Sequence, residues 1–160
     1  MEARLSRWGV GPKIALGAVV YASLAAVATY LWPEVCLLHF VPYAAFLVLG
    51  AILLAVGVPL WLAGVVAAMT AYNKDSLVTS GVFGIVRHPI YAAWIVFNLP
   101  GIALLCRSWP LLATALVAYA VFKLTIRRED EYLEQRFGQA YRDYRWRVNE
   151  IVPMPKFGQR

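Results

Sequence analysis

Four long apolar stretches, separated by short polar segments, organise the chain. None of them alternates polar and apolar residues as barrel strands do, so helices are the expected elements. A helix needs about 20 mainly apolar residues to cross a bilayer, and each stretch comes close to that length. The predicted spans are residues 14–32, 43–69, 89–106 and 109–126. Because little more than Arg107 and Ser108 separates the last two, they are expected to form a tight hairpin.

Composition supports this interpretation. Of the 160 residues, 61% are apolar and only 15% are charged, and the mean hydropathy is +0.62. Such a chain is too apolar for a small soluble domain. A cleaved signal is an alternative for residues 14–32, but these 19 residues exceed the usual apolar region of about 7 to 15. The sequence therefore predicts an all-α integral membrane protein, with residues 1–160 forming one membrane domain.

The basic residues lie mostly on one side of the predicted spans. Three of the fifteen precede the first span, two lie between the second and third, and nine follow from Lys123 onward, which leaves only Arg107 for the other side. This asymmetry predicts four crossings, with both termini, the loop between the second and third spans and a C-terminal helical segment on the cytoplasmic side. The net charge of +6 then favours contact with anionic lipid head groups over nucleic acid, because the basic residues form no separate domain.

The second span carries Gly50, Gly57 and Gly64 at intervals of seven residues. This spacing places them near one helix face, where another helix is able to approach closely. Pro59 removes a backbone donor from the same helix and is expected to kink it.

Residues 80–94 read SGVFGIVRHPIYAAW and place a cation and an imidazole where the third span begins. Pro89 suits the first position of a helix, because it has no N–H to leave unpaired. One interpretation is structural, with Arg87 reaching lipid phosphates and His88 capping the helix. The other is that the helix start binds an anionic group such as a ligand carboxylate. The segment alone leaves both open.

The segment after the fourth span, residues 125–148, favours a site. Drawn as a helix at 100° per residue, it has one apolar stripe. The stripe consists of Ile126, Leu133 and Phe137. Glu129 and Asp130 flank it within roughly 60° of its centre, and carboxylates on a packing face need partners, because burying an unpaired charge is costly. Ionisable groups at the membrane are functional candidates, although a structural salt bridge to Arg87 or Arg127 is an alternative.

Two motifs carry a family resemblance: VTSGVFGIVRHPIYAAW and, after the hairpin, REDEYLEQRFGQAYRDY. Together they resemble T-x-G-x-Y-x-x-V-R-H-P-x-Y-x-G and E-E-x-x-L-x-x-x-F-G-x-x-Y-x-x-Y of the isoprenylcysteine carboxyl methyltransferase family and the related phospholipid N-methyltransferases. The likeness covers residues 77–144. It implies a membrane enzyme that uses S-adenosylmethionine without a Rossmann domain, with residues 77–147 as the cofactor-binding half. No G-x-G-x-x-G fingerprint is present.

The resemblance also implies a set of site residues. The cofactor-binding residues would be Arg87, His88, Pro89, Tyr91, Glu129, Asp130, Leu133, Tyr141 and Tyr144. Phe83, Ala93 and Asp130 depart from the family pattern but keep its aromaticity, small size and charge. Glu150 stands where the family has an arginine. Arg87, His88 and Glu150 are the expected catalytic residues, Glu150 as a general base, and no metal site is predicted.

The expected reaction is methyl transfer from S-adenosylmethionine to an O, N or S atom of a lipid, a lipid-tailed molecule or a small apolar acceptor. Loss of the family arginine argues against a carboxylate acceptor, since Glu150 better tolerates an amine or a phenolic hydroxyl. Two other functions remain open. One is a membrane reductase of the sterol reductase type that uses a nicotinamide cofactor, and the other is a small non-enzymatic transport or assembly protein. The pattern predicts no oligomeric state.

Overall fold

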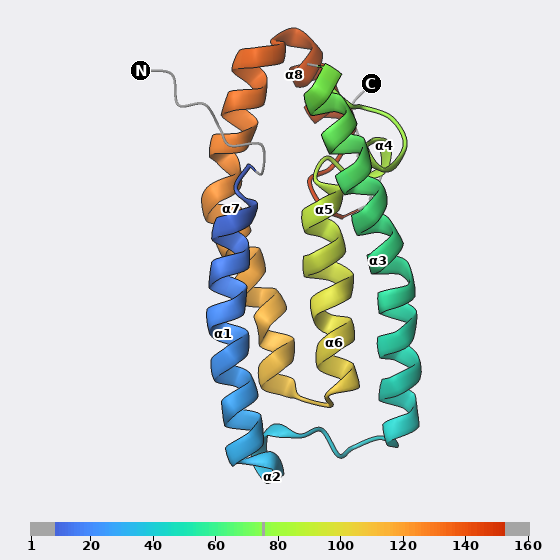
Figure 1. The fold of residues 1–160 in the computed structure, drawn as a ribbon, viewed down its shortest axis with the longest axis vertical. Coiled ribbons are helices and arrows are strands. Elements are labelled where there is room, and N and C mark those ends of the chain that lie inside the picture. The colour runs from blue at the N-terminus through green and yellow to red at the C-terminus, as the bar shows by residue number, and fades with distance from the viewer. Residues whose placement is uncertain (1–8, 75, 153–160) are drawn as a thin grey trace.

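A computed structural model describes residues 9–74 and 76–152 of the chain, and most of these residues are helical. The elements are α1 (Gly11–Leu31), α2 (Pro33–Cys36), α3 (Tyr43–Lys74), α4 (Val82–Ile85), α5 (Pro89–Ala92), the π-helix η1 (Ala93–Asn98), α6 (Leu99–Leu105), α7 (Trp109–Phe137) and α8 (Gln139–Arg147). Figure 1 shows α1, α3, the first part of α7 and the composite rod of α5, η1 and α6 running side by side along the long axis.

Three of these helices are long and apolar enough to cross a membrane: α1, α3 and α7. Their apolar residues largely face outward, as with Leu16 and Leu24 of α1, which are 66% and 65% exposed. So much outward apolar surface suits lipid rather than water. The predicted third span is apolar but shorter, running from Pro89 to Leu105. The protein is thus an all-helical integral membrane protein, and the fourth crossing stays a prediction.

The hairpin between α6 and α7 is as tight as the sequence predicts. Arg107 adopts a positive φ of 50° in the connection, and the Ser108 side chain accepts a hydrogen bond from Leu111 N–H as the N-cap of α7. The predicted orientation rests partly on Arg4 and Arg7, which lie outside the described residues.

The glycine face of α3 packs against the composite rod, as expected. A Cβ added at Gly50 would lie 2.9 Å from the carbonyl oxygen of Gly101, and one added at Gly64 would lie 3.0 Å from the side chain of Ile90. At Gly57 the added atom would collide with the Asn98 side chain. Only glycine permits this approach, and α3 remains one helix through Pro59.

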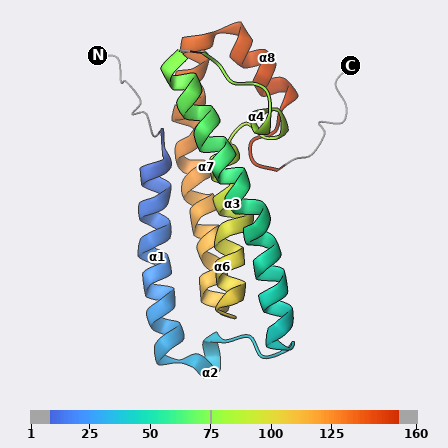
Figure 2. The same ribbon diagram turned by 45° about the vertical axis from the view of Figure 1, so that its right-hand side comes forward.

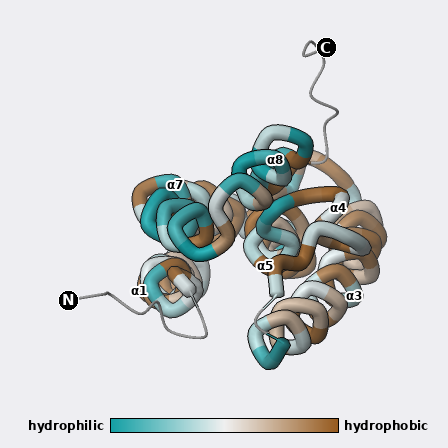
Figure 3. Tube along the Cα trace, turned by 90° about the horizontal axis from the view of Figure 1, so that it is seen from above, coloured by the Kyte–Doolittle hydropathy of each residue, from teal (hydrophilic) through white to brown (hydrophobic). Residues whose placement is uncertain are grey.

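Helix α7 carries the chain from the bundle to the polar end of the molecule without interruption. It packs along α1 and ends at Gly138, whose φ of 56° turns the chain into α8. Figure 2 shows α8 crossing the end of the bundle near α4. Seen from above, hydrophilic residues gather on α7 and α8, whereas α3 is mostly hydrophobic (Figure 3). The charged residues of α7 and α8 therefore lie at one end of an apolar bundle, which is called here the polar end.

Candidate functional site

Arg87, His88 and Pro89 form a buried turn, named here the RHP turn, between α4 and α5. Arg87 and His88 are only 6% and 5% exposed. Pro89 occupies the first turn of α5, and the His88 carbonyl accepts the hydrogen bond from Ala92 N–H at 2.9 Å. The backbone N–H groups of Arg87 and His88 donate to the carbonyls of Asn149 and Glu150 at 2.7 and 2.9 Å. The RHP turn is therefore held by residues 148–152, which follow α8 and are named here the return segment.

Asp130 of α7 lies buried against the RHP turn. Arg87 Nη1 donates to both of its carboxylate oxygens at 3.3 Å, and His88 Nε2 lies 3.3 Å from Oδ1. The hydroxyl of Tyr141 in α8 donates to the same oxygen in a short hydrogen bond. A carboxylate that is 4% exposed is stable only when paired in this way. Asp130 thus joins the RHP turn, α7 and α8.

Glu129, the neighbouring carboxylate, makes a different set of contacts. Its Oε2 accepts hydrogen bonds from Val10 N–H at 3.0 Å and from the Tyr91 hydroxyl at 2.9 Å. Its Oε1 lies 3.7 Å from His88 Nδ1. The His88 ring stacks on Tyr91 with 5.8 Å between centroids. Glu129 therefore ties the start of α1 to α5 and α7, and the imidazole lies between two carboxylates.

The tyrosines of α8 act as hydrogen-bond donors. The Tyr144 hydroxyl donates to the carbonyl of Phe83 at 2.7 Å and so holds α4 against α8. Burial raises the pKa of Tyr144 above its ordinary value. Burial, followed by the hydrogen bond to Asp130 and the charge of Asp130, likewise raises the pKa of Tyr141, although Arg87 partly opposes this. Both phenols therefore remain protonated donors near neutral pH.

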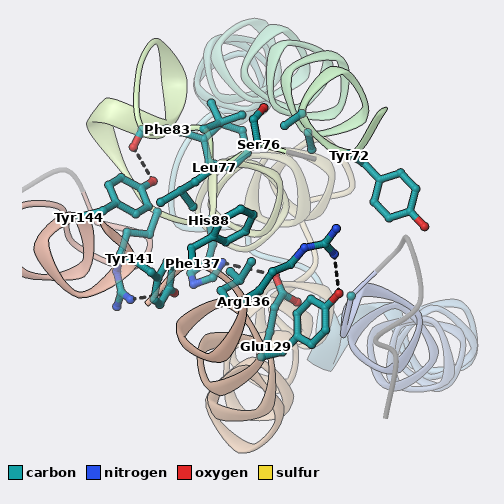
Figure 4. Close-up of a pocket in the computed structure, with 17 residues that line it drawn as sticks. Tyr72, Ser76, Leu77, Phe83, His88, Glu129, Arg136, Phe137, Tyr141 and Tyr144 are labelled. Carbon is teal, nitrogen blue, oxygen red and sulfur yellow. Dashed lines mark hydrogen bonds and ion pairs between the residues drawn. The ribbon is translucent and has the colours of Figure 1, made fainter. Parts of the chain in front are cut away.

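A cavity of about 200 Å³ opens at the polar end and is named here the end cavity. The close-up in Figure 4 shows the rings of Tyr141 and Tyr144 from α8 and of Phe83 from α4 on one side, with His88, Glu129 and Arg136 on the other. Its lining includes Tyr72, Ser76, Leu77, Phe83, Arg87, His88, Glu129, Leu133, Arg136, Phe137, Tyr141 and Tyr144. The end cavity therefore combines a carboxylate, two guanidinium groups, an imidazole and aromatic faces.

A second cavity of about 540 Å³ lies between the start of α1, α3 and α5, and is named here the side cavity. Its lining is mostly apolar and includes Trp61, Val65, Met69, Pro89, Ile90 and Tyr91. Residues common to both linings include Gly9, Phe83, His88 and Glu129. The two cavities therefore adjoin, and His88 and Glu129 are the charged or titratable side chains from the RHP turn and α7 at their common boundary.

The structure distributes the predicted site residues unevenly. Arg87, Leu133, Tyr141 and Tyr144 line the end cavity, Pro89 and Tyr91 line the side cavity, and His88 and Glu129 line both. Neither cavity includes Asp130 or Glu150 among its lining residues. Asp130 instead holds Arg87, His88 and Tyr141, and Glu150 contacts Arg87 and Lys123. The roles assigned to all of these residues remain predictions.

Several lining residues were not anticipated from the sequence, among them Tyr72, Arg136 and Trp61. Arg136 had a usable signal, because Glu129, Leu133 and Arg136 follow one another at i, i+4 and i+7 and so share a helix face. Tyr72 and Trp61 had none, since an aromatic residue near the end of an apolar span is ordinarily explained by the membrane interface.

Comparison of the sequence with known proteins identifies a family that matches more than half of the chain. The family model described as "Isoprenylcysteine carboxyl methyltransferase (ICMT) family" matches residues 43–135, more than half of the chain. Protein-S-isoprenylcysteine O-methyltransferase B of Arabidopsis thaliana is 38% identical over 81 residues, which cover 51% of this chain and 41% of the relative. The Schizosaccharomyces pombe protein-S-isoprenylcysteine O-methyltransferase is 36% identical over 83 residues, covering 51% and 35%.

The match leaves most of each relative uncovered. The chain aligns with about two fifths of the Arabidopsis protein's length and with 32% of the Dictyostelium discoideum protein-S-isoprenylcysteine O-methyltransferase, to which it is 31% identical over 77 residues. No solved structure matches the chain significantly.

Proposed function

Because the chain belongs to the isoprenylcysteine carboxyl methyltransferase family, we propose that it is a membrane methyltransferase that uses S-adenosylmethionine. Its acceptor is a lipid or another molecule with an apolar tail, methylated on an O, N or S atom. The names of the relatives make an S-isoprenylated cysteine the first acceptor to test. The family match favours this function over a nicotinamide-dependent reductase and over a non-enzymatic membrane protein.

The observation that carries the proposal is the pair of adjoining cavities. The end cavity opens at the α8 end, and its lining carries two guanidinium groups, an imidazole and a carboxylate, whereas the side cavity is larger, has no guanidinium group in its lining and lies among helices that are long and apolar enough to cross a membrane. A methyl transfer between a polar donor and an apolar acceptor needs two such compartments with one point of contact, because the reacting atoms must come within about 3–3.5 Å of each other. His88 and Glu129 lie at that point.

The lining of the end cavity fits the chemistry of S-adenosylmethionine. The Glu129 carboxylate is suited to the ammonium group, and the guanidinium groups of Arg87 and Arg136 are suited to the carboxylate. Arg87 Nε is buried and has no hydrogen-bond partner among the described residues, so this guanidinium retains a donor to offer. The rings of Phe83 and Phe137 supply faces for an adenine. When bound, the cofactor would supply an electrophilic methyl group.

The chain's own residues would orient the partners and take up a proton where the acceptor releases one. Asp130 holds the Arg87 guanidinium and the His88 imidazole in place, and Tyr91 fixes Glu129. An acceptor that attacks as a carboxylate needs no base, whereas a thiol, amine or hydroxyl has to lose a proton. His88 and Glu129 are the groups shared by both linings that would take up that proton.

The proposal includes an orientation. The charge asymmetry of the sequence supports placing the end cavity on the cytoplasmic side, where S-adenosylmethionine is available. An acceptor with an apolar tail would reach the side cavity from the bilayer.

Binding and transfer in purified protein test the proposal. The chain in mild detergent is titrated with S-adenosylmethionine and, in parallel, with reduced nicotinamide cofactor. Labelled methyl transfer is then followed into three acceptors: an S-isoprenylated cysteine, an apolar thiol and a lipid extract. We expect binding of S-adenosylmethionine alone and labelling of at least one acceptor. Folded protein that binds no S-adenosylmethionine would refute the proposal.

A further inference from the structure

The Glu150 side chain bridges two cations from different parts of the chain. Its Oε2 lies 2.7 Å from Lys123 Nζ of α7, and its Oε1 lies 3.6 Å from Arg87 Nη2 of the RHP turn. The Glu150 side chain is 29% exposed and the Lys123 side chain 46%, whereas the Arg87 side chain is 5% exposed. The bridge therefore runs from the protein surface to a buried guanidinium.

Both terminal nitrogens of the Arg87 guanidinium contact carboxylates. Nη1 contacts Asp130 at 3.3 Å, and Nη2 contacts Glu150. A planar guanidinium held by carboxylates at both terminal nitrogens cannot rotate about its long axis, whereas a single contact leaves that rotation possible. Both contacts depend on α7: Asp130 belongs to α7, and Lys123 of α7 holds Glu150. Lys123 and Asp130 are seven residues apart and so lie on nearly the same helix face.

We infer that Glu150 is a positioning residue that sets the orientation of Arg87 in the end cavity, and that Lys123 holds Glu150 in place for this purpose. The inference rests on the proposed function, in which Arg87 binds the carboxylate of S-adenosylmethionine. It assigns a role to Lys123, which no motif of the chain marks, and it replaces the general-base role predicted for Glu150.

Two features argue against the general-base role. Glu150 is absent from the lining of both cavities, and a base must reach the acceptor's proton within about 2.6–3.2 Å or through one water. Its two carboxylate oxygens each face a different cation of this chain rather than a cavity. The return segment is also fixed at this point, because the Glu150 carbonyl accepts from His88 N–H and Ile151 is buried in the core.

Three variants test whether the Glu150 bridge positions Arg87 or only attaches the return segment to α7. E150Q keeps the shape of the side chain but removes its charge, and K123M removes the cation that holds it. The double variant K123E/E150K restores a lysine–glutamate pair with the charges exchanged, but it places the lysine beside Arg87, where it repels the guanidinium.

Each variant is measured for its dissociation constant for S-adenosylmethionine, its kcat at saturating cofactor, its KM for the acceptor and its melting temperature. We expect E150Q to weaken cofactor binding roughly tenfold, because a misoriented Arg87 would lose about one hydrogen bond to the carboxylate of the cofactor, with little change in the KM for the acceptor. K123M should weaken cofactor binding roughly threefold, as for a half-exposed ion pair. The double variant should recover part of the melting temperature lost in K123M but none of the affinity. If E150Q folds poorly, K123M and the double variant carry the test.

The Arg127–Glu131 pair supplies a matched control. It lies on the same helix with a 3.0 Å contact, but both side chains are well exposed, so R127E/E131R should change neither affinity nor melting temperature. If K123E/E150K restores both affinity and stability, the bridge only attaches the return segment and the inference is wrong. Unchanged affinity in E150Q, with normal wild-type binding, overturns it as well. A wild-type chain that binds no cofactor overturns the proposed function and this inference together.

Discussion

Replacing Asp130 with asparagine should loosen the contact among the RHP turn, α7 and α8. Asparagine keeps the shape of the side chain but removes its charge and turns one oxygen into an NH₂ group. Arg87 Nη1 lies 3.3 Å from both carboxylate oxygens, and the Tyr141 hydroxyl also donates to Oδ1. Whichever way the new amide points, its NH₂ group therefore faces another donor.

The cost can be worked from these contacts. Removing one partner of a buried ion pair usually costs about 3–5 kcal/mol, because the remaining charge is left uncompensated. Glu150 still lies 3.6 Å from Arg87 Nη2 and offsets part of this penalty, so we expect about 3 kcal/mol. For a chain of this size, each kcal/mol lowers the melting temperature by roughly 2–4 °C. The D130N variant should therefore melt about 6–12 °C below the wild type.

The assay is thermal unfolding of purified protein in mild detergent, followed by tryptophan fluorescence. Asp143→Asn is the matched control, because Asp143 lies exposed on α8 and accepts one hydrogen bond from Gln139 at 2.8 Å. The D143N variant should melt within about 2 °C of the wild type. If D130N loses no more stability than D143N, the buried cluster around Asp130 does not hold the end of the molecule together.

Three further results are expected. In Gly57→Ala the new Cβ would lie 2.6 Å from the Cβ of a phenylalanine in η1, so the free energy of unfolding should fall by about 1–3 kcal/mol and the melting temperature with it. In Gly11→Ala the nearest atom to the new Cβ is 3.7 Å away, so the melting temperature should not change. Val65→Phe narrows the side cavity and should raise the KM for an apolar acceptor several-fold. Calorimetry should find the affinity for S-adenosylmethionine unchanged. If the variant also loses affinity for S-adenosylmethionine, the two ligands do not occupy separate cavities. Because the folded-state pKa of Tyr141 is raised, its contribution is complete below the unfolded pKa near 10 and is lost as pH rises beyond it. Melts from pH 8 to 11 should therefore steepen above about pH 10 in the wild type and less so in Tyr141→Phe, and identical profiles would contradict this.

Much of the fold follows from local properties of the sequence. Length and apolarity predict α1, α3 and α7 as membrane helices, because a bilayer imposes the same requirement wherever a span lies in the chain. The glycine spacing of α3 likewise predicts a close helix contact, since seven residues make nearly two turns. The sequence did not predict that α7 continues from the apolar span through Glu129 to Phe137, because the change to charged residues marks the end of the membrane rather than the end of the helix.

Periodicity also placed Glu129 and Asp130 near the packing face of their helix, but it did not distinguish them. The structure buries Asp130 among Arg87, His88 and Tyr141, whereas Glu129 lines both cavities. Adjacent residues on a helix differ by 100° in direction. Which neighbour each one meets depends on the elements that pack there.

The sequence by itself determined the membrane-spanning character, the helical stretches and the family motifs, because these depend on residues close together in the chain. Only the tertiary structure decided that Val10 donates to Glu129 across 119 positions and that the return segment brings Glu150 between Arg87 and Lys123. The spacing of apolar residues along a helix predicts which face is buried but not which other element packs against that face. The division into an end cavity and a side cavity follows from how the helices pack, and no local pattern encodes it.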